Sequence, residues 1–213
     1  MIASAARARA FAAVVAAVAW CGLALQMALL VRDFVADGEG ALAAVWRFFA
    51  YFTLLTNLLV ALVASGAALG GRFTPSVQVL TATTLYIAIV GVVYHFILSA
   101  TWSPAGWSFV ADKIVHYATP VLMAAYWIAC VPKGRHRWRD VVGWLGYPVG
   151  YLIYAVARGA LDGFYPYFFI DLPRIGWSAL AVNAAALFAF FLAAGLGLVA
   201  IDRWMGRRVS GAG

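Results

Sequence analysis

A histidine, a carboxylate and two threonines carry the chemistry that this sequence offers. Asp112 and His116 are four residues apart, so on a helix they share one face. Thr53, Thr56 and Asn57 follow the i, i+3, i+4 pattern and also share a face. A neutral imidazole can accept the proton of a threonine hydroxyl while a carboxylate holds the ring in the productive tautomer. The pattern therefore predicts Thr53 or Thr56 as a nucleophile, His116 as its base and Asp112 as the orienting group.

The same residue types also have ordinary structural roles. A threonine in an apolar helix often donates to its own i−4 carbonyl, and Asn57 or Asn183 can link two helices. His95, His116 and Asp112 are ligand types that zinc accepts, but two helices would have to bring the two imidazoles together. The sequence contains no glycine-rich phosphate loop and no dinucleotide fingerprint. We therefore expect neither a metal nor a cofactor.

The composition excludes a water-soluble monomer. Of 213 residues, 66% are hydrophobic and 11% are charged, whereas soluble domains have about 45–50% apolar and about 25% charged residues. Too few polar side chains remain to cover a surface in water. The net charge of +7 comes from 15 basic residues spread between apolar blocks, so no nucleic-acid partner is expected. Cys21 and Cys130 form neither a disulfide framework nor a metal-ligand pattern.

Six apolar stretches are long enough to cross a bilayer, which takes about 20 residues at about 1.5 Å per residue. They cover residues 10–31, 48–70, 78–101, 107–131, 141–160 and 176–201. The sequence contains no internal repeat, and no soluble domain lies between the stretches. The expected fold is therefore all-α, a single polytopic domain over residues 1–213 with six transmembrane helices.

The basic residues of the connections predict the orientation. If both termini are cytoplasmic, the inner side holds Arg7, Arg9, Arg72, Lys133, Arg135, Arg137, Arg139, Arg203, Arg207 and Arg208. The outer side then holds only Arg32, Arg47, Arg158 and Arg174, and Lys113 lies within a span. The run from Lys133 to Arg139 is most simply a positive-inside anchor, with a nucleic-acid or lipid-regulatory site as the alternative. His136 within this run is expected to have no special role.

Five of the six stretches place polar side chains in one layer, in the outer half of the membrane. This layer follows from the span boundaries, the alternating direction of the helices and the helical rise. Ionisable groups at such depth usually face a bundle interior or a wet cavity. The layer contains Thr53, Thr56, Asn57, Tyr94, His95, Ser99, Asp112, Lys113, His116, Tyr117, Tyr151, Tyr154, Arg158 and Asn183.

Pro120 disturbs the helix that carries the histidine. It lies four residues after His116 and has no N–H to donate to the histidine carbonyl. The sequence therefore predicts a free backbone acceptor and a bend at His116.

Supporting groups are expected around the layer. A stripe at i, i+3 and i+7 is formed by Tyr151, Tyr154 and Arg158. An oxyanion would be stabilised by Asn57, Arg47 or Arg158. The aromatic segment 161–175 is expected to cap the site.

Three segments together resemble the androgen-induced-protein-like family. They are RFFAYFTLLTNLLVAL (47–62), VADKIVHYATPVLM (110–123) and YPVGYLIYAVARGALDGFYPYFFID (147–171). The resemblance implies a six-helix membrane hydrolase that cleaves fatty acid esters of hydroxy fatty acids with an intramembrane threonine and histidine. These fall on Thr53 and His116, and a shift of one turn would exchange Thr53 for Thr56. The chain is most similar to the bacterial branch, which implies the inner membrane.

We therefore expect a membrane-embedded hydrolase acting on a lipid ester, with the aliphatic tails of the substrate between the helices. A proton-coupled or small-solute transporter would use the same polar layer as a relay. In a non-catalytic membrane partner the layer would only specify packing. A transporter should also have a polar path through the inner half, where this sequence has few polar residues.

Overall fold

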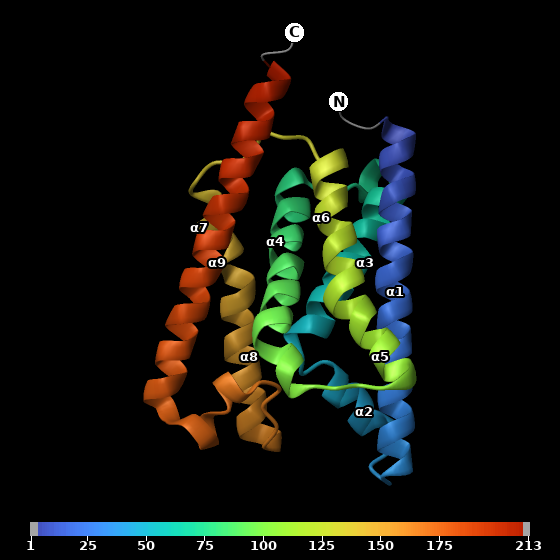
Figure 1. Ribbon diagram of the computed structural model, residues 1–213, viewed down its shortest axis with the longest axis vertical. Coiled ribbons are helices and arrows are strands. Elements are labelled where there is room, and N and C mark those ends of the chain that lie inside the picture. Colours follow the sequence, from blue (N-terminus) through green and yellow to red (C-terminus); the bar gives the residue numbers. More distant parts are fainter. Residues whose placement is uncertain (1–3, 211–213) are drawn as a thin grey trace. The chain divides into compact units, whose positions relative to one another are not determined.

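The computed structural model describes residues 4–210 of the chain, and those residues form helices and connections with no β-strand. The prediction of an all-α fold is confirmed. The helices form two compact units, Met1–Pro132 (unit 1) and Lys133–Gly213 (unit 2), each with its own internal contacts (Figure 1).

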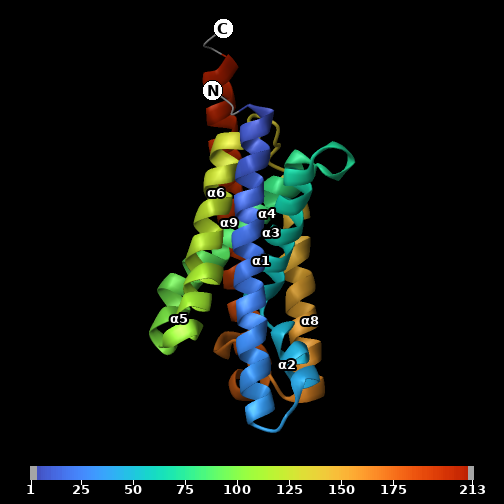
Figure 2. The same ribbon diagram turned by 90° about the vertical axis from the view of Figure 1, so that its right-hand side faces the viewer.

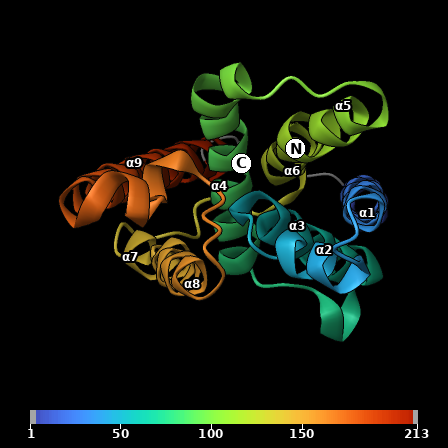
Figure 3. The ribbon, with the colours of Figure 1, turned by 90° about the horizontal axis from the view of Figure 1, so that it is seen from below.

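Unit 1 is assembled on its long N-terminal helix, α1 (Ala5–Ala36), which packs along α3 (Phe52–Leu69). The short helix α2 (Ala41–Phe48) connects the two. A second rod consists of α4 (Val77–Val93), η2 (Tyr94–Leu98) and η3 (Ser99–Thr101). A third consists of α5 (Gly106–Lys113), η4 (Ile114–Ala118) and α6 (Thr119–Cys130). Figures 2 and 3 show α3 and the α5–α6 rod on different sides of α1.

Unit 2 contains two main helices, α8 (Gly146–Asp162) and α9 (Leu172–Ser210), with α7 (Asp140–Trp144) and the short turn η5 (Phe168–Ile170). Gly176 interrupts α9 near its start with φ 75° and ψ 167°, a backbone conformation that favours glycine. The interior of the unit is formed where α8, η5 and α9 meet, around Ala155, Ile170 and Leu180.

Four of the described rods are long and apolar enough to cross a membrane: Ala5–Ala36, Phe52–Leu69, Val77–Thr101 and Leu172–Arg208. They coincide with four of the six predicted spans. The predicted span 107–131 is helical without interruption from Gly106 to Cys130, but it contains two charged residues, Asp112 and Lys113. The predicted span 141–160 corresponds mainly to α8, whose 17 residues extend about 26 Å.

The C-terminal end of α3 is capped by a side chain from α1. The last carbonyls of a helix have no partner in the helix itself. Arg9 supplies one, because its Nε donates to the Ala68 carbonyl (2.9 Å) and its Nη2 to the Leu69 carbonyl (2.7 Å). A cation at this end also complements the helix dipole. Arg9 therefore fixes the end of α3 against α1.

Gly22 allows α1 to approach η4 closely. A Cβ at Gly22 would lie 2.5 Å from Ile114 Cγ2 and 3.3 Å from Val115 Cγ1. We expect Gly22→Ala to destabilise unit 1 by about 1–3 kcal/mol, because an overpacked interface forces side chains and backbone apart. Thermal unfolding in detergent measures this effect.

The matched control for this prediction is Gly150→Ala in α8. Among the residues that the structure describes, a Cβ at Gly150 would meet no atom within 4 Å, so its unfolding midpoint should not fall. A Gly22→Ala protein as stable as the wild type would contradict the close approach of α1 and η4.

Candidate active site

Two π-helices lie at the centre of the candidate site. Residues Tyr94–Leu98 (η2) and Ile114–Ala118 (η4) have the wide π-helical turn, in which an N–H bonds to the carbonyl five residues earlier. The Thr119 N–H accordingly donates to the Ile114 carbonyl. Such segments are rare and frequently lie at functional sites. Each carries a histidine next to a tyrosine.

The tyrosine of one π-helix contacts the histidine of the other. The two rods run in opposite directions (Figure 1). As a result, Tyr94 lies opposite His116, and His95 lies opposite Tyr117. The ring of Tyr94 stacks on the imidazole of His116, with centroids 3.7 Å apart and planes at 14°. The hydroxyl of Tyr117 lies 3.2 Å from Nδ1 of His95. The structure therefore brings these four predicted layer residues together as two Tyr–His pairs.

Asp112 connects the first of these pairs. Its Oδ1 accepts a hydrogen bond from Nδ1 of His116 (3.1 Å), and its Oδ2 accepts one from the Tyr94 hydroxyl (2.7 Å). The residue is 3% exposed. The spacing of Asp112 and His116 in the sequence thus corresponds to a direct side-chain hydrogen bond.

These contacts determine the tautomer of His116. Its Nδ1 faces two acceptors, Oδ1 and the carbonyl oxygen of Asp112, each at 3.1 Å. The proton of the neutral ring therefore resides on Nδ1, and Nε2 carries the lone pair. Nε2 makes no hydrogen bond with any residue that the structure describes. An imidazole oriented by a buried carboxylate, with its second nitrogen unengaged, has the arrangement of a general base.

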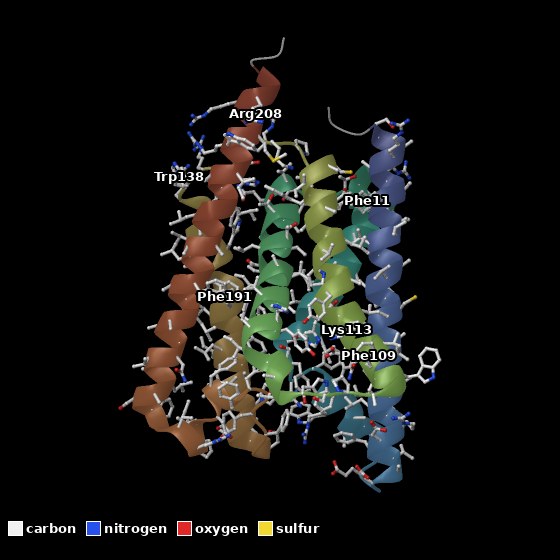
Figure 4. All side chains as sticks on the ribbon, in the orientation of Figure 1. Phe11, Phe109, Lys113, Trp138, Phe191 and Arg208 are labelled. Atoms are coloured by element: carbon white, nitrogen blue, oxygen red, sulfur yellow. The ribbon has the colours of Figure 1, made fainter. Side chains whose placement is uncertain are left out.

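Lys113 supplies the positive charge next to this carboxylate. Its Nζ lies 3.4 Å from Oδ2 of Asp112. The same ammonium lies 4.7 Å, 5.0 Å and 5.8 Å from the ring centroids of Tyr117, Phe109 and Tyr94. Figure 4 labels Lys113 and Phe109 on the same stretch of helix. These cation–π contacts hold the ammonium group beside the rings, although the Lys113 side chain is 43% exposed.

Asn57 joins α3 to η4. Its Nδ2 donates to the carbonyls of Thr53 (2.8 Å) and Val115 (3.0 Å). In the π-helical pattern the Val115 carbonyl would accept from residue 120, but Pro120 has no N–H. Asn57 supplies the missing donor from another helix. Because an amide nitrogen has two hydrogens, Asn57 has none left for the oxyanion that the sequence assigned to it.

Thr53 and Thr56 differ in accessibility. Thr53 is 7% exposed, whereas Thr56 is fully buried. Thr53 also lies exactly one hydrogen-bonded turn before Asn57, on the face of α3 that contacts η4. Thr53 therefore lies one turn before the residue that ties α3 to η4, and it is the less completely buried of the two threonines.

The two arginines predicted to stabilise an oxyanion both have other contacts. In unit 2, Nη1 of Arg158 donates to the Tyr154 hydroxyl (2.9 Å), and its Nε lies 3.5 Å from Oδ2 of Asp162. In unit 1, the guanidinium of Arg47 lies 5.5 Å from the ring centroid of Phe34. The structure thus gives Arg158 partners on its own helix.

Within unit 2, two predicted site residues, Asn183 and Tyr151, contact segment 161–175 or the residues packed against it. Asn183 Nδ2 donates to the Phe169 carbonyl (2.9 Å), which ties the segment to α9. Tyr151 packs against the hydrophobic cluster that includes Ile170. Both predicted site residues therefore stabilise this segment. The role of the segment as a cap stays a prediction.

His136 is a polar residue whose environment sequence reasoning missed. The sequence predicted no special role for it, but its side chain is buried. Its backbone N–H donates to Oδ2 of Asp202 (3.1 Å), its Nδ1 lies 3.8 Å from Oδ2 of Asp140, and its ring packs edge-on against Trp144. Asp202 comes 66 residues later, so no local pattern indicates this burial.

The burial of His136 should make the stability of unit 2 depend on pH. Burial lowers the pKa of His136 below its ordinary value of 6.5; Asp202 and Asp140 oppose the shift and Lys133 adds to it. The unfolded histidine therefore binds a proton at a higher pH than the folded one. Stability should be highest while His136 is neutral in both states, and it should fall as the pH drops below about 6.5.

Thermal unfolding in detergent from about pH 8 to about pH 5 tests this dependence. The wild-type midpoint should fall with pH, and the fall should be smaller in His136→Gln, which cannot bind the proton. Equal pH dependence in the two proteins would show that His136 is not responsible.

No group of three or more His, Cys, Asp or Glu side chains within the described residues could hold a metal ion. No protein-family model, no curated protein and no solved structure matches the chain. The contacts around Asp112 and His116 are therefore the structural feature that bears most directly on function.

Proposed function

We propose that this protein is an integral membrane hydrolase that cleaves a lipid carboxylic ester with a threonine nucleophile and a histidine base. One observation supports this function best: His116 Nδ1 donates to the buried Asp112 carboxylate, and Nε2 makes no hydrogen bond within the described residues. Tyr94 adds to the arrangement, because it stacks on the imidazole and donates to the same carboxylate. A base held in this way is prepared to accept a proton.

Thr53 is the nucleophile that we propose. It is the more accessible of the two threonines and lies on the face of α3 that Asn57 ties to η4. The sequence resemblance points to the same residue. Thr56, one turn further along α3, is fully buried.

The proposed reaction proceeds in two steps. Nε2 of His116 takes the proton of the Thr53 hydroxyl as its oxygen attacks the ester carbonyl, and the imidazolium then protonates the leaving alcohol. Water, activated by the same nitrogen, attacks the acyl-threonine and releases the fatty acid and Thr53. Asp112 stabilises the imidazolium in both steps.

The substrate class follows from the resemblance and from the apolar helices around the site. We propose a fatty acid ester of a hydroxy fatty acid or a similar lipid ester, with its tails among the apolar helices. The four rods that are long and apolar enough to span a bilayer support a substrate taken from the membrane.

We also propose six membrane crossings, with both termini in the cytoplasm of a bacterium and the chain in its inner membrane. The uninterrupted helix from Gly106 to Cys130 supports a crossing there, because it extends about 37 Å. The excess of basic residues on one set of connections supports the orientation.

Turnover of a panel of lipid esters by the detergent-purified protein tests the proposed function. The panel includes fatty acid esters of hydroxy fatty acids, and an activity-based serine/threonine hydrolase probe is applied to the same samples. Hydrolysis and labelling should be lost in Thr53→Ala, and hydrolysis should be lost in His116→Ala. The matched control is Thr84→Ala, whose hydroxyl donates to the Leu80 carbonyl of its own helix, and it should retain activity.

The alternatives give different results in this experiment. An active Thr53→Ala protein would refute the nucleophile, and activity lost in Thr56→Ala instead would transfer the role to Thr56. Folded wild-type protein with neither turnover nor labelling would refute the hydrolase and favour transport or binding.

A further inference from the structure

The basic segment that follows unit 1 is held firmly against the C-terminal part of α9. The Gly134 N–H donates to the Asp202 carbonyl (3.1 Å), and the His136 N–H donates to the Asp202 carboxylate. Gly134 and Gly206 lie backbone against backbone, since a Cβ at Gly206 would be 2.6 Å from the Gly134 Cα. Residues 133–139 therefore have a defined position on α9.

The two carboxylates near this segment, Asp202 and Asp140, contact residues 133–139 themselves. Asp202 is fully buried and accepts from the His136 backbone. Oδ2 of Asp140 accepts from the Arg137 N–H (2.8 Å) and faces the imidazole of His136. Among the described ion pairs, none involves an arginine of the segment 133–139 or of the end of α9. No carboxylate in these ion pairs neutralises the arginines of the region, so their positive charge is available to a binding partner.

We define the basic surface as the arginines of this segment together with those at the end of α9: Arg135, Arg137, Arg139, Arg203, Arg207 and Arg208. Two tryptophans lie among them, Trp138 (49% exposed) and Trp204 (53% exposed). Arg203 lies 5.7 Å from the Trp138 ring centroid and Arg208 lies 3.8 Å from that of Trp204. Figure 4 labels Trp138 and Arg208 near the C-terminal end of α9. The surface is therefore both strongly cationic and aromatic.

We propose that the basic surface binds the phosphate groups of anionic phospholipids. A guanidinium matches the geometry of a phosphate and binds it through two N–H groups. The surface lies at the end of Leu172–Arg208, one of the rods that can cross a membrane. From Trp177 to Ser210, α9 extends about 51 Å, well beyond about 30 Å of hydrocarbon. Its last turns therefore reach the headgroup region.

The tryptophans favour a lipid over a nucleic acid. Tryptophan is enriched where hydrocarbon meets headgroups, because its ring is apolar and its N–H is polar. Anionic lipids attract clusters of basic residues next to a spanning helix. Here each exposed ring lies next to a guanidinium group, Trp138 beside Arg203 and Trp204 beside Arg208. This combination fits a phosphate and the adjoining acyl region of the same lipid.

Native mass spectrometry of the full chain with defined lipids tests the proposal. Cardiolipin and phosphatidylglycerol should remain bound, and phosphatidylcholine should be lost under the same conditions. The test variant is Arg135→Gln/Arg137→Gln. Each basic residue near an anionic surface contributes about fivefold to binding, so the double variant should bind the anionic lipids about 25-fold more weakly.

The matched control is Arg7→Gln/Arg72→Gln, which removes two exposed cations from the same predicted side of the membrane. It should retain the wild-type affinity. Equal weakening in both variants would overturn the proposal, because net charge rather than this surface would then determine binding. Trp138→Ala is a second variant with unchanged charge, and it should also weaken lipid retention. The unfolding midpoint of each variant confirms that it is folded.

Two further arms distinguish the source of the phosphate. Glycerol phosphate, at the lipid concentration, should not displace bound cardiolipin; displacement would mean that a soluble phosphate is the ligand. A single-stranded oligonucleotide should bind more weakly than cardiolipin at equal salt. Tighter binding of the oligonucleotide would overturn the lipid assignment in favour of a nucleic acid.

Discussion

If the proposed hydrolase mechanism holds, Asp112→Asn should reduce the rate of ester hydrolysis by about 100- to 10,000-fold while leaving the protein folded. In the wild type, Asp112 accepts from His116 Nδ1, so the lone pair is on Nε2. An asparagine can turn its NH2 group toward Nδ1 and thereby favour the tautomer with the proton on Nε2. That tautomer cannot accept the proton of Thr53. The loss should appear in kcat and not only in KM, because substrate binding does not depend on the tautomer.

Steady-state kinetics on an ester that the wild type cleaves measure this effect. The matched control is Asp33→Asn, which removes a carboxylate from an exposed ion pair with Arg32 (2.7 Å) and should have wild-type kcat. A folded Asp112→Asn protein with wild-type kcat would exclude the Asp112–His116 pair as the catalytic base.

Asn57→Asp should destabilise unit 1 by at least about 3 kcal/mol, whatever reaction the protein catalyses. Asn57 is fully buried, and its Nδ2 donates to the carbonyls of Thr53 and Val115. A carboxylate at this position would face two carbonyl oxygens. It would have to remain charged without a partner or bind a proton and donate to only one of the carbonyls. The charged form leaves the Val115 carbonyl without its donor, and the protonated form loses one of the two hydrogen bonds.

Thermal unfolding and the yield of folded protein in detergent measure this loss. Asn183→Asp provides the comparison, because Asn183 donates to the single Phe169 carbonyl at a partly exposed position. It should cost less than Asn57→Asp. Equal losses in the two variants would contradict a special role for the two-carbonyl contact of Asn57.

The spacing of residues along single helices predicted part of the site. Asp112 and His116 were placed on one face from their four-residue separation, and the structure joins them by a hydrogen bond. The side-chain amide of Asn57 also bonds to the Thr53 carbonyl one turn earlier on the same helix. These relations depend only on helical geometry, so a sequence contains them.

The contacts between helices required the structure. Pro120 indicated that a carbonyl near His116 loses its donor, but the sequence assigned this to the carbonyl of His116 in an α-helical pattern. In the structure the π-helical pattern of η4 makes the Val115 carbonyl the one that Asn57 satisfies. The stacking of Tyr94 on His116 also depends on how the α4–η3 rod and the α5–α6 rod are aligned along their axes. Neither fact follows from periodicity along one helix.

The number of membrane spans also shows what the sequence predicts and what it does not. Hydropathy predicted the four rods that are long and apolar enough to cross a membrane. The helical segment from Gly106 to Cys130 is not among these four, and it contains two charged residues of the candidate site, Asp112 and Lys113. Charged residues lower the mean hydropathy of a helix, so hydropathy alone does not identify this segment as a span.

Each π-helix acts as a one-residue insertion in an otherwise α-helical rod. A helical wheel that advances about 100° per residue from Gly106 therefore falls out of phase after Ala118, and the side chains of α6 point in directions about 100° from those the wheel assigns. The same phase shift applies to the α4 rod after Leu98. An alignment of this chain with a regular helical bundle therefore needs a one-residue gap in the bundle sequence opposite each π-helix. The same one-residue correction applies when the polar residues of this chain are mapped onto a straight α-helix.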